Sequence, residues 1–147
     1  MKTVYILRAV PGAGKSTVAD DIHEAMTKSG KTALICCADD FHVDLDGNYN
    51  WSIDTVGHGH LWCKREFEEA IQEGIDCIIV SNTNVIAKDV NHYRNLAIEN
   101  GYMVFVLVVE NWHNGKDVHN VPDEIKVKMK DQLVNSMRLF PNPINEN

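Results

Sequence analysis

The sequence lacks the basic excess and the paired cysteines that mark two large classes of binding protein. Its 147 residues hold 14 lysines and arginines against 21 aspartates and glutamates, a formal net charge of -7 at pH 7. Proteins that grip long duplex nucleic acid neutralise many phosphates at once, and this charge balance disfavours that mode of binding. It does not exclude a small nucleic acid end held in a local basic pocket.

The four cysteines form no metal or disulfide pattern. Cys36 and Cys37 are adjacent, and Cys63 and Cys77 stand alone, so no Cys-x-x-Cys spacing occurs. Reduced thiols in a cytosolic protein are the simpler interpretation. The opening apolar run reaches Arg8 too early for a signal peptide, and no segment is long and apolar enough to cross a membrane. We therefore expect a cytoplasmic protein without a membrane partner.

What the sequence does contain is a glycine-rich stretch between two regular elements. Residues 3–7 form a short apolar run typical of a buried strand, and residues 18–26 place apolar side chains at helical spacing. Residues 9–17 have the sequence AVPGAGKST, which fits the pattern GxxxxGK[ST] except that Ala9 replaces the first glycine. A small residue there still allows the tight turn. The order of strand, glycine-rich turn and helix predicts a phosphate-binding P-loop.

Each residue type in this stretch suits a polyphosphate. Gly12 and Gly14 allow backbone conformations that a Cβ atom would oppose, so that successive N–H groups point at phosphate oxygens. The following helix adds its unpaired N–H groups and the positive end of its dipole. We expect Lys15 to reach the β- and γ-phosphates and the Ser16 hydroxyl to ligate Mg²⁺. The predicted nucleotide-binding residues are Gly12, Ala13, Gly14, Lys15, Ser16 and Thr17.

The rest of the chain alternates between apolar runs and helical patterns. Strands are predicted at 32–37, 75–80 and 102–109, and helices at 61–73, at 88–100 and from Pro122 onward. This alternation indicates an α/β fold of three layers, the P-loop NTPase and kinase fold, with helices on both faces of a parallel sheet of four to five strands. We expect one P-loop kinase domain over residues 1–147, with 139–147 as a flexible tail.

Polar side chains follow each of the predicted later strands. They are Asp39 and Asp40, Asn82 and Asn84, and Glu110. Because ligands of parallel sheets bind beyond the carboxyl ends of the strands, we expect these groups to converge on the P-loop. Asp39 is the candidate for the group that accepts a proton from the phosphate acceptor. An Asx turn or a helix N-cap is an equally good interpretation of an Asp-Asp pair at this position.

Candidates for a cation over the transferred phosphate come from two places. Segment 110–120 has no apolar periodicity and contains Asn-Gly, so it is predicted to be a mobile loop, and it carries Lys116, His113 and His119. A loop lysine of this kind is more often simply solvated. Arg8, directly after the first strand, is the other candidate, although it could instead pair with a carboxylate.

Two further features are weaker signals. His58 and His60 invite a metal hypothesis, but no third well-spaced ligand accompanies them. Trp51, Trp62 and Trp112 could stack on a base, although packing within a helix or loop is the more common use of such residues. The sequence therefore favours neither a zinc site nor a tryptophan platform.

With these residues identified, the chain resembles the P-loop kinase module of polynucleotide 5′-hydroxyl kinases, phage-type and eukaryotic. The likeness is to a motif series that spans most of the chain. It consists of LRAVPGAGKST at 7–17, DDF at 39–41, the helix that precedes Gly74, IIVSNTN at 78–84 and HNVP at 119–122. The segment IIVSNTN is the most specific of these after the P-loop.

The resemblance implies roles for individual residues. It implies an ATP- and Mg²⁺-dependent kinase in which Asp39 is the general base and Lys15 neutralises charge on the phosphates. Lys116 corresponds to the lid residue that closes over them. The acceptor-binding positions that the resemblance implies are His42, Asn82 and Asn84.

Several arginines of that family are missing here. Lys116 replaces the lid arginine that clamps the phosphates, and a lysine lacks the bidentate fork of a guanidinium. His42 replaces an arginine that binds an acceptor phosphate, Trp112 replaces a second lid arginine, and Gln132 stands where some relatives have arginine. These departures predict weaker phosphate clamping, a different acceptor or lost activity.

The residues support three functional hypotheses. The first is transfer of the γ-phosphate of ATP to a hydroxyl, with a polynucleotide 5′-OH as the acceptor. The second keeps the P-loop kinase chemistry but uses a small molecule, a nucleoside or a modified base, which the acidic balance and the missing arginines favour. The third is a nucleotide-binding module without catalysis that acts through a partner.

Overall fold

The computed structural model describes residues 1–52, 54–117 and 120–137. His119 and the predicted tail at 139–147 lie outside these residues. The strands are β1 (Thr3–Arg8), β2 (Ala33–Cys36), β3 (Cys77–Ser81) and β4 (Met103–Val108). The helices are α1 (Lys15–Lys28), α2 (Val56–Glu73), α3 (Ala87–Glu99) and α4 (Asp123–Ser136), and a 3-10 helix, η1 (Ala38–His42), follows β2.

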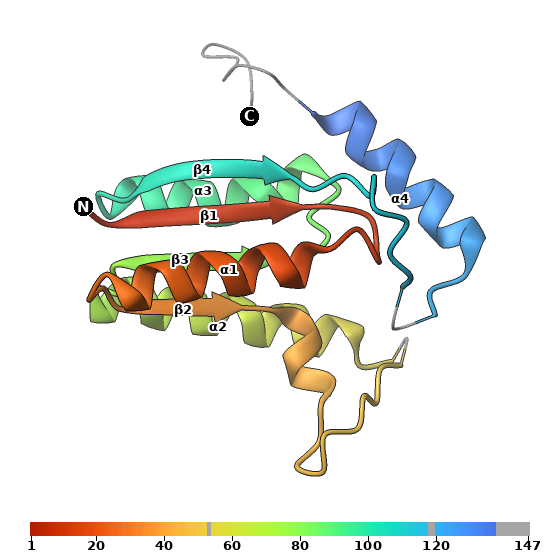
Figure 1. Cartoon of the computed structure of the whole chain (residues 1–147), viewed down its shortest axis with the longest axis horizontal. Helices are drawn as coiled ribbons and strands as arrows, with labels where there is room; N and C mark the ends of the chain where they lie inside the picture. The colour runs from red at the N-terminus through yellow and green to blue at the C-terminus, as the bar shows by residue number, and fades with distance from the viewer. Residues whose placement is uncertain (53, 118–119, 138–147) are drawn as a thin grey trace.

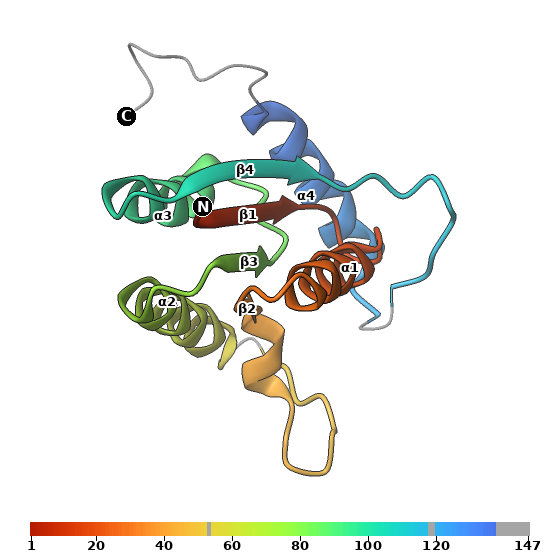
Figure 2. The same cartoon turned by 60° about the vertical axis from the view of Figure 1, so that its left-hand side comes forward.

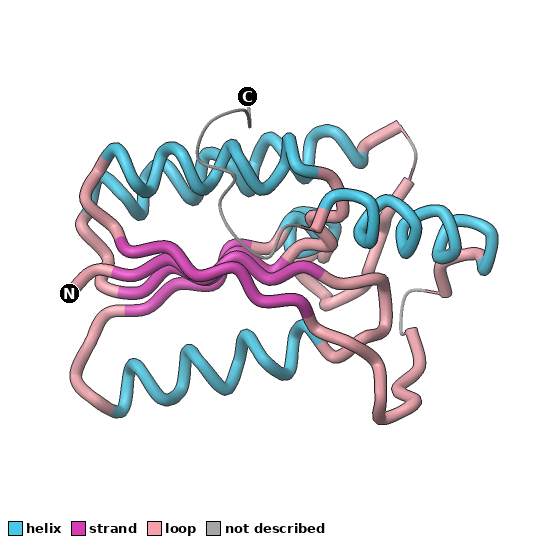
Figure 3. Tube along the Cα trace, turned by 90° about the horizontal axis from the view of Figure 1, so that it is seen from above, coloured by secondary structure: helices cyan, strands magenta, loops and turns pink. Residues whose placement is uncertain are grey.

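The four strands form one parallel sheet in the order β2-β3-β1-β4 (Figure 1). Helix α1 covers one face of the sheet, and α2 and α3 cover the other face (Figure 3). The predicted three-layer α/β architecture is therefore confirmed, with four strands in the described part of the chain. No helix in that part combines the length and the apolar character needed to cross a bilayer.

The core lies on both faces of the two central strands, β1 and β3. All five residues of β3 are buried, which explains why its sequence is a continuous apolar run rather than an alternating one. On one face the rings of Phe67 and Tyr93 meet edge to face at 5.0 Å, where α2 packs beside α3. On the other face Leu7 and Ile79 pack against Ala19 of α1. These layers hold the carboxyl ends of the strands in fixed positions.

Helix α2 begins at Val56, five residues before the predicted start of 61, so that His58 and His60 lie in its first turns. Gly57 and Gly59 interrupt the apolar periodicity in this turn, so the sequence pattern does not indicate a helix there. Gly59 is needed there, because a Cβ atom would lie 2.7 Å from the Nε2 atom of His42. The first turn of α2 therefore packs closely on η1. Leu61, by contrast, is half exposed and does not lie on the buried face.

Helix α4 crosses the carboxyl end of the sheet instead of covering a face of it (Figure 1). Its last residue, Ser136, fixes this position. The Ser136 hydroxyl donates to the carbonyl of Val85 at 2.7 Å and accepts from the Arg8 guanidinium at 2.6 Å. The helix begins at Asp123 with Pro122 as its N-cap, one residue after the predicted start. The segment between β4 and α4 is therefore brought over the P-loop.

Candidate active site

The P-loop has the backbone conformation that its glycines predict. Gly12 and Gly14 have φ values of 83° and 99°, in the left-handed region. Lys15 is the first residue of α1, so the amides of the loop run directly into the start of the helix. Ala9, at the position of the missing glycine, is fully buried, and its N–H donates to the carbonyl of Thr83 at 3.0 Å. A small residue is sufficient there because the loop is tied to the end of β3.

A cavity of about 620 Å³ opens beside the P-loop, at the carboxyl end of the sheet. Its walls come from the P-loop, η1 and the loop after it, the end of β3, the segment before α4, and α4 itself. The predicted site residues that line it are Gly12, Gly14, Lys15, Ser16, Thr17, Asp39, His42, Asn82 and Lys116. Predicted residues that do not line it are Ala13, which is buried, and Asn84. The expected convergence therefore holds for most of the predicted residues, but Glu110 is not among the lining residues.

Asp39 lies within η1 and does not cap a helix. The N-cap residue is Cys37, and no side chain caps η1, so the N-cap interpretation is wrong. One oxygen of the Asp39 carboxylate accepts a hydrogen bond from the Tyr49 hydroxyl at 3.0 Å. Burial, together with the negative charge of Asp39, raises the pKa of Tyr49 and raises that of Cys37 to about 11. Burial and the charge of Asp39 also raise the pKa of the Asp40 carboxyl. The charge of Asp39 therefore adds to the effect of burial at all three neighbouring groups.

The two asparagines of the IIVSNTN segment support the site through the backbone. Asn82 is buried, and its Oδ1 accepts the N–H of Ala38 at 2.8 Å, which ties the end of β3 to η1. Its Nδ2 donates to the Cys63 sulfur at 3.4 Å. Asn84 has a φ of 47° and donates from Nδ2 to the carbonyl of Leu7 at 2.8 Å. Both amides therefore position the strand ends on which the cavity is built.

His42 is buried between the site and α2. Its ring lies against Gly59 and makes edge contacts with the rings of Phe41 and Tyr49. It lines the cavity, as expected for an acceptor-side residue, but most of its surface is covered. His60 lines the cavity as well.

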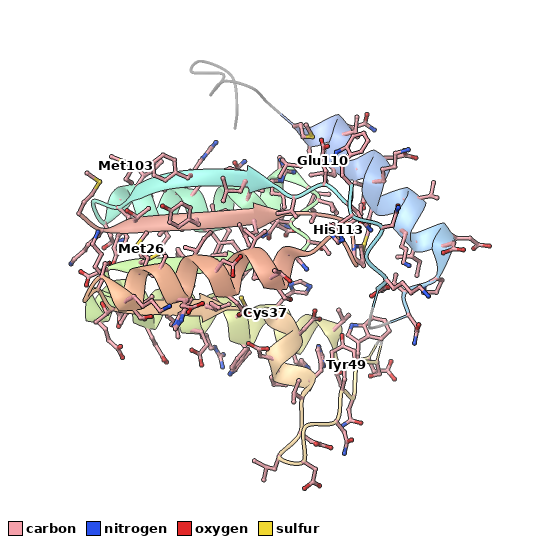
Figure 4. The ribbon with its side chains drawn as sticks, in the orientation of Figure 1. Met26, Cys37, Tyr49, Met103, Glu110 and His113 are labelled. Atoms are coloured by element: carbon pink, nitrogen blue, oxygen red, sulfur yellow. The ribbon has the colours of Figure 1, made fainter. Side chains whose placement is uncertain are left out.

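Residues 110–117, which we call the lid segment, lie against the P-loop. The amide of Asn111 donates to the carbonyl of Gly12 at 3.3 Å, and Nε2 of His113 lies 3.0 Å from the carbonyl of Ala13. Because Nδ1 of His113 accepts the N–H of Gly115, the hydrogen on Nε2 donates to Ala13. Figure 4 shows His113 and Tyr49 at the same end of the sheet, on the lid segment and on the loop after η1. The lid segment therefore forms one wall of the cavity and η1 with its loop forms another.

The far end of the lid segment is anchored to α4. The side chain of Asp117 is 3% exposed, lies 3.6 Å from the Lys126 ammonium, and accepts the N–H of Val121 at 2.6 Å. Lys116 lies next to it, is exposed and lines the cavity. Trp112 is 86% exposed, so packing, the more common role considered for it, is wrong at this position. Its indole donates to the Glu110 carboxylate.

Arg8 is not available to cover a phosphate. It is 5% exposed, and its Nε donates to the carbonyl of Asn84 at 2.7 Å while a second nitrogen donates to Ser136. Burial lowers its pKa, and the nearby charge of Asp89 acts in the opposite direction. Its guanidinium joins β1, the loop after β3 and α4. Arg8 therefore supports the frame of the site. Of the described candidates for a cation over the transferred phosphate, Lys116 and His113 line the cavity.

The side chains fit a hard cation held mainly by phosphates. Mg²⁺ prefers oxygen ligands and is commonly bound by one or two protein oxygens together with substrate phosphates. Ser16, whose hydroxyl is the predicted protein ligand, lines the cavity and carries a group of this kind. Among the described residues, no three histidine, cysteine, aspartate or glutamate side chains are grouped to hold a metal ion, so His58 and His60 lack a third ligand there.

Tyr49, Trp51 and His113 are cavity residues that the sequence did not identify as a set. Tyr49 lies within the stretch 44–50, whose composition predicts a turn and which carries no apolar periodicity, so no pattern marks it as a site residue. The one available signal was that stretch itself, since Asp and Asn side chains before a glycine favour a closed turn that returns the chain to its start.

Comparisons with known proteins agree with this architecture. NEDD4-binding protein 2 of Homo sapiens is 28% identical over 133 residues, which cover 86% of this chain and 7% of the human protein. APS kinase CysC of Mycobacterium tuberculosis, in complex with AMPPNP and APS, aligns with a TM-score of 0.55 at 16% identity, over 74% of this chain and 62% of that one. A chain of the Pnkp1/Rnl/Hen1 complex aligns with a TM-score of 0.55 at 17% identity, over 99% of this chain and 43% of that one.

At 16% and 17% identity, these solved structures show that the fold is shared, and they show nothing about activity. This chain spans less than two thirds of the length of each of these three proteins. Their activities are therefore not assigned to this chain. The likeness to polynucleotide kinases in particular stays a prediction. The family model for the Zeta toxin matches residues 1–113, more than three quarters of the sequence. With the P-loop, the parallel sheet and the lid segment in place, that match shows that the chain belongs to the Zeta toxin family, a family with the P-loop kinase fold.

Proposed function

We propose that this protein is an ATP- and Mg²⁺-dependent phosphotransferase that moves the γ-phosphate to a hydroxyl acceptor. The observation that carries the proposal is that one cavity brings together a P-loop and a carboxylate. Lys15 and Ser16 line it from one side and Asp39 from another. Phosphoryl transfer needs mainly placement, charge neutralisation and a group that takes the acceptor's proton, and these residues supply all three.

Each residue has a distinct role in this proposal. The P-loop amides and Lys15 bind the β- and γ-phosphates, and the lid segment carries Lys116 over them. Asp39 accepts the proton of the attacking hydroxyl, with its carboxylate oriented by Tyr49. Bound Mg²⁺ supplies further charge neutralisation on the phosphates, and Ser16 is its proposed protein ligand. Asn82 holds η1, and with it Asp39, against the end of β3.

The acceptor that the motif series supports is a polynucleotide 5′-OH. Asp39 of DDF and Asn82 and Thr83 of IIVSNTN line the cavity, and so does His42, for which the resemblance implies acceptor binding. A single polynucleotide end needs only a local pocket, which the negative net charge of the chain allows.

A second candidate, a small acceptor without its own phosphate, is favoured by the charges of the cavity. Lys15 and Lys116 are the only lysines or arginines among the described residues that line it, and both belong to the ATP side. An acceptor phosphate would therefore find no guanidinium on the side of Asp39. We further propose that residues 1–147 act as a single kinase domain in the cytoplasm, where the cysteines, all free thiols, would remain reduced.

The test is transfer from radiolabelled ATP to a panel of 5′-OH oligonucleotides and small alcohols. We expect labelled product with at least one acceptor and none with the Lys15→Ala variant. Labelled oligonucleotide supports the first acceptor and labelled small product supports the second. If no acceptor is labelled while MgATP still binds, and if Asp39→Ala leaves that binding unchanged, the protein is a nucleotide-binding module and the transfer chemistry is refuted.

A further inference from the structure

The loop between η1 and α2 forms a wall of the cavity that is separate from the P-loop. We infer that residues 43–51 of this loop recognise a flat, uncharged ring on the phosphate acceptor, with Trp51 as the stacking surface and Tyr49 as a positioning residue for Asp39. The inference rests on the proposed function and names the class of its acceptor, an alcohol that carries an aromatic ring. Both Tyr49 and Trp51 line the cavity.

The loop is closed by a dense set of hydrogen bonds around Asp44. One carboxylate oxygen of Asp44 accepts the N–H groups of Asp46 and Asn48 at 2.9 and 2.8 Å, and the other accepts the Asn50 amide at 3.1 Å. These bonds lower the pKa of the Asp44 carboxyl, led by the backbone bond from Asn48. The loop projects from η1 as a hairpin in Figure 2. These hydrogen bonds stabilise one conformation of the hairpin, which can therefore hold its side chains in fixed positions.

Tyr49 stands at the point where the hairpin returns to η1. It pairs with Val43 in an antiparallel bridge, and the N–H of Asn50 donates to the carbonyl of His42 at 2.7 Å. This return brings the Tyr49 hydroxyl to the Asp39 carboxylate at 3.0 Å. A carboxylate held by a phenol has a defined orientation, which is what a general base requires. The hairpin thus connects acceptor recognition to the proton acceptor.

Trp51 follows Tyr49 by two residues and is 46% exposed, although it lines the cavity. Two residues of chain span at most roughly 7 Å, so the backbone of Trp51 lies within that distance of the backbone of Tyr49. A ring stacked on Trp51 could therefore place a hydroxyl, carried on a short saturated linker, near Asp39. A partly exposed indole in a cavity wall is a suitable stacking surface for a flat ring.

The charges on this wall favour an uncharged acceptor over an anionic one. Asp39 contributes a carboxylate, and among described residues no lysine or arginine of the hairpin or of η1 lines the cavity. A phosphate beside the acceptor hydroxyl would face the Asp39 carboxylate with the imidazoles of His42 and His60 nearby but no lysine or arginine from this wall, which is unfavourable. A nucleoside satisfies all of these conditions, because it has a flat ring, a short linker, a primary hydroxyl and no charge.

The first test measures binding, so that it does not depend on turnover. Adenosine and ribose are compared by saturation-transfer NMR on the full chain with Mg-AMPPNP present. We expect adenosine to bind more tightly than ribose, and Trp51→Ala to weaken adenosine binding by about tenfold. Trp51→Phe should keep most of the affinity, and Leu45→Ala, at the exposed tip of the same hairpin, should have no effect. Equal binding of ribose, no binding of adenosine, or an unchanged Trp51→Ala variant overturns the inference.

The second test compares an uncharged acceptor with acceptors that carry phosphate charge. We expect adenosine to bind, and to be phosphorylated, better than adenosine 3′-monophosphate or a 5′-OH oligonucleotide. The opposite order overturns the inference and supports a polynucleotide acceptor. If wild-type protein binds adenosine but transfers no phosphate to any acceptor, the proposed function fails while this recognition stands.

The third test separates a positioning role of Tyr49 from a merely structural one. We expect Tyr49→Phe to lower kcat by about tenfold with little change in the KM for ATP, and to cause no further loss in an Asp39→Asn background. Equal losses in both backgrounds overturn the positioning role. Independently of turnover, ring carbon NMR should show that Asp39→Asn lowers the pKa of the Tyr49 hydroxyl, and an unchanged pKa would contradict the contact.

Discussion

The cavity has two halves that are built in opposite ways. The proposed phosphate half is a single stretch of chain between β1 and α1, where Gly12 and Gly14 set the direction of the backbone amides that would bind phosphate. The acceptor half is assembled from η1, a hairpin and the end of β3, and it depends on individual side chains such as Tyr49 and Asn82. Local backbone geometry leaves a pattern in the sequence, whereas a surface assembled from separate segments does not.

The largest effect on the phosphate half is expected from a change at Lys15. We expect Lys15→Ala to abolish detectable MgATP binding and to lower turnover by about 10²- to 10³-fold, because a fixed cation facing the phosphates is removed. Calorimetric titration of MgATP measures the first effect. The matched control is Lys31→Ala, an exposed lysine in the turn before β2, which should bind as wild type does. Equal binding by Lys15→Ala and wild type would show that the P-loop is not the phosphate site.

Asp39→Asn should damage the acceptor half and leave the phosphate half intact. We expect kcat to fall by about 10²-fold or more, because an amide cannot take the acceptor's proton, while the affinity for MgATP stays within about twofold. Initial rates and a binding titration on the same sample separate the two effects. Its neighbour provides the control, since Asp40→Asn has a similar shape change but should retain activity. Loss of activity in both variants would contradict a specific role for Asp39.

A substitution at Arg8 tests the contacts that join β1 to Asn84 and to α4 beside the cavity. We expect Arg8→Met to reduce the free energy of unfolding by about 1–3 kcal/mol, because the buried carbonyl of Asn84 loses its donor. Urea unfolding followed by circular dichroism measures this change. Ser136→Ala, which removes the partner on α4, should cost less. If Arg8→Met is as stable as wild type but cannot bind ATP, Arg8 has a direct role at the phosphates.

The smallest effect is expected at Asp40. Its pKa is raised in the folded state, so the folded protein resists ionisation of this carboxyl more than the unfolded chain does. Asp40→Asn should therefore raise stability slightly at pH 7, and the gain should disappear below about pH 4, where the carboxyl is protonated in both states. Unfolding midpoints in urea at several pH values test this. A gain that persists at low pH would assign the effect to something other than ionisation.

The sequence predicted the fold more completely than the site. Alternating apolar runs and helical patterns identified the strands and helices, because a doubly covered sheet requires them. The early start of α2 was missed, because Gly57 and Gly59 interrupt the apolar period where that helix packs closely on η1. Arg8 is a catalytic candidate in the sequence because it directly follows the first strand. Its hydrogen bond to Ser136 of α4 joins residues from opposite ends of the chain, so the sequence could not reveal its structural role.

Within the site, the same division holds. Asp39 was identified from its place after a strand, but its partner Tyr49 was not, since the hairpin that returns Tyr49 to η1 depends on the several bonds of Asp44. The bonds between the lid segment and the P-loop were equally invisible, because they join residues about a hundred positions apart, as in the pair Ala13 and His113.

The central claim, that the amides of residues 12–17 hold a polyphosphate, is tested most directly with inorganic tripolyphosphate. A titration of ¹⁵N-labelled protein with magnesium tripolyphosphate, followed by amide NMR, reports each N–H group separately. We expect saturable shifts that are largest at Gly12, Gly14, Lys15 and Ser16 and small at the hairpin of Tyr49. Shifts centred elsewhere, or none in folded protein, would contradict the account.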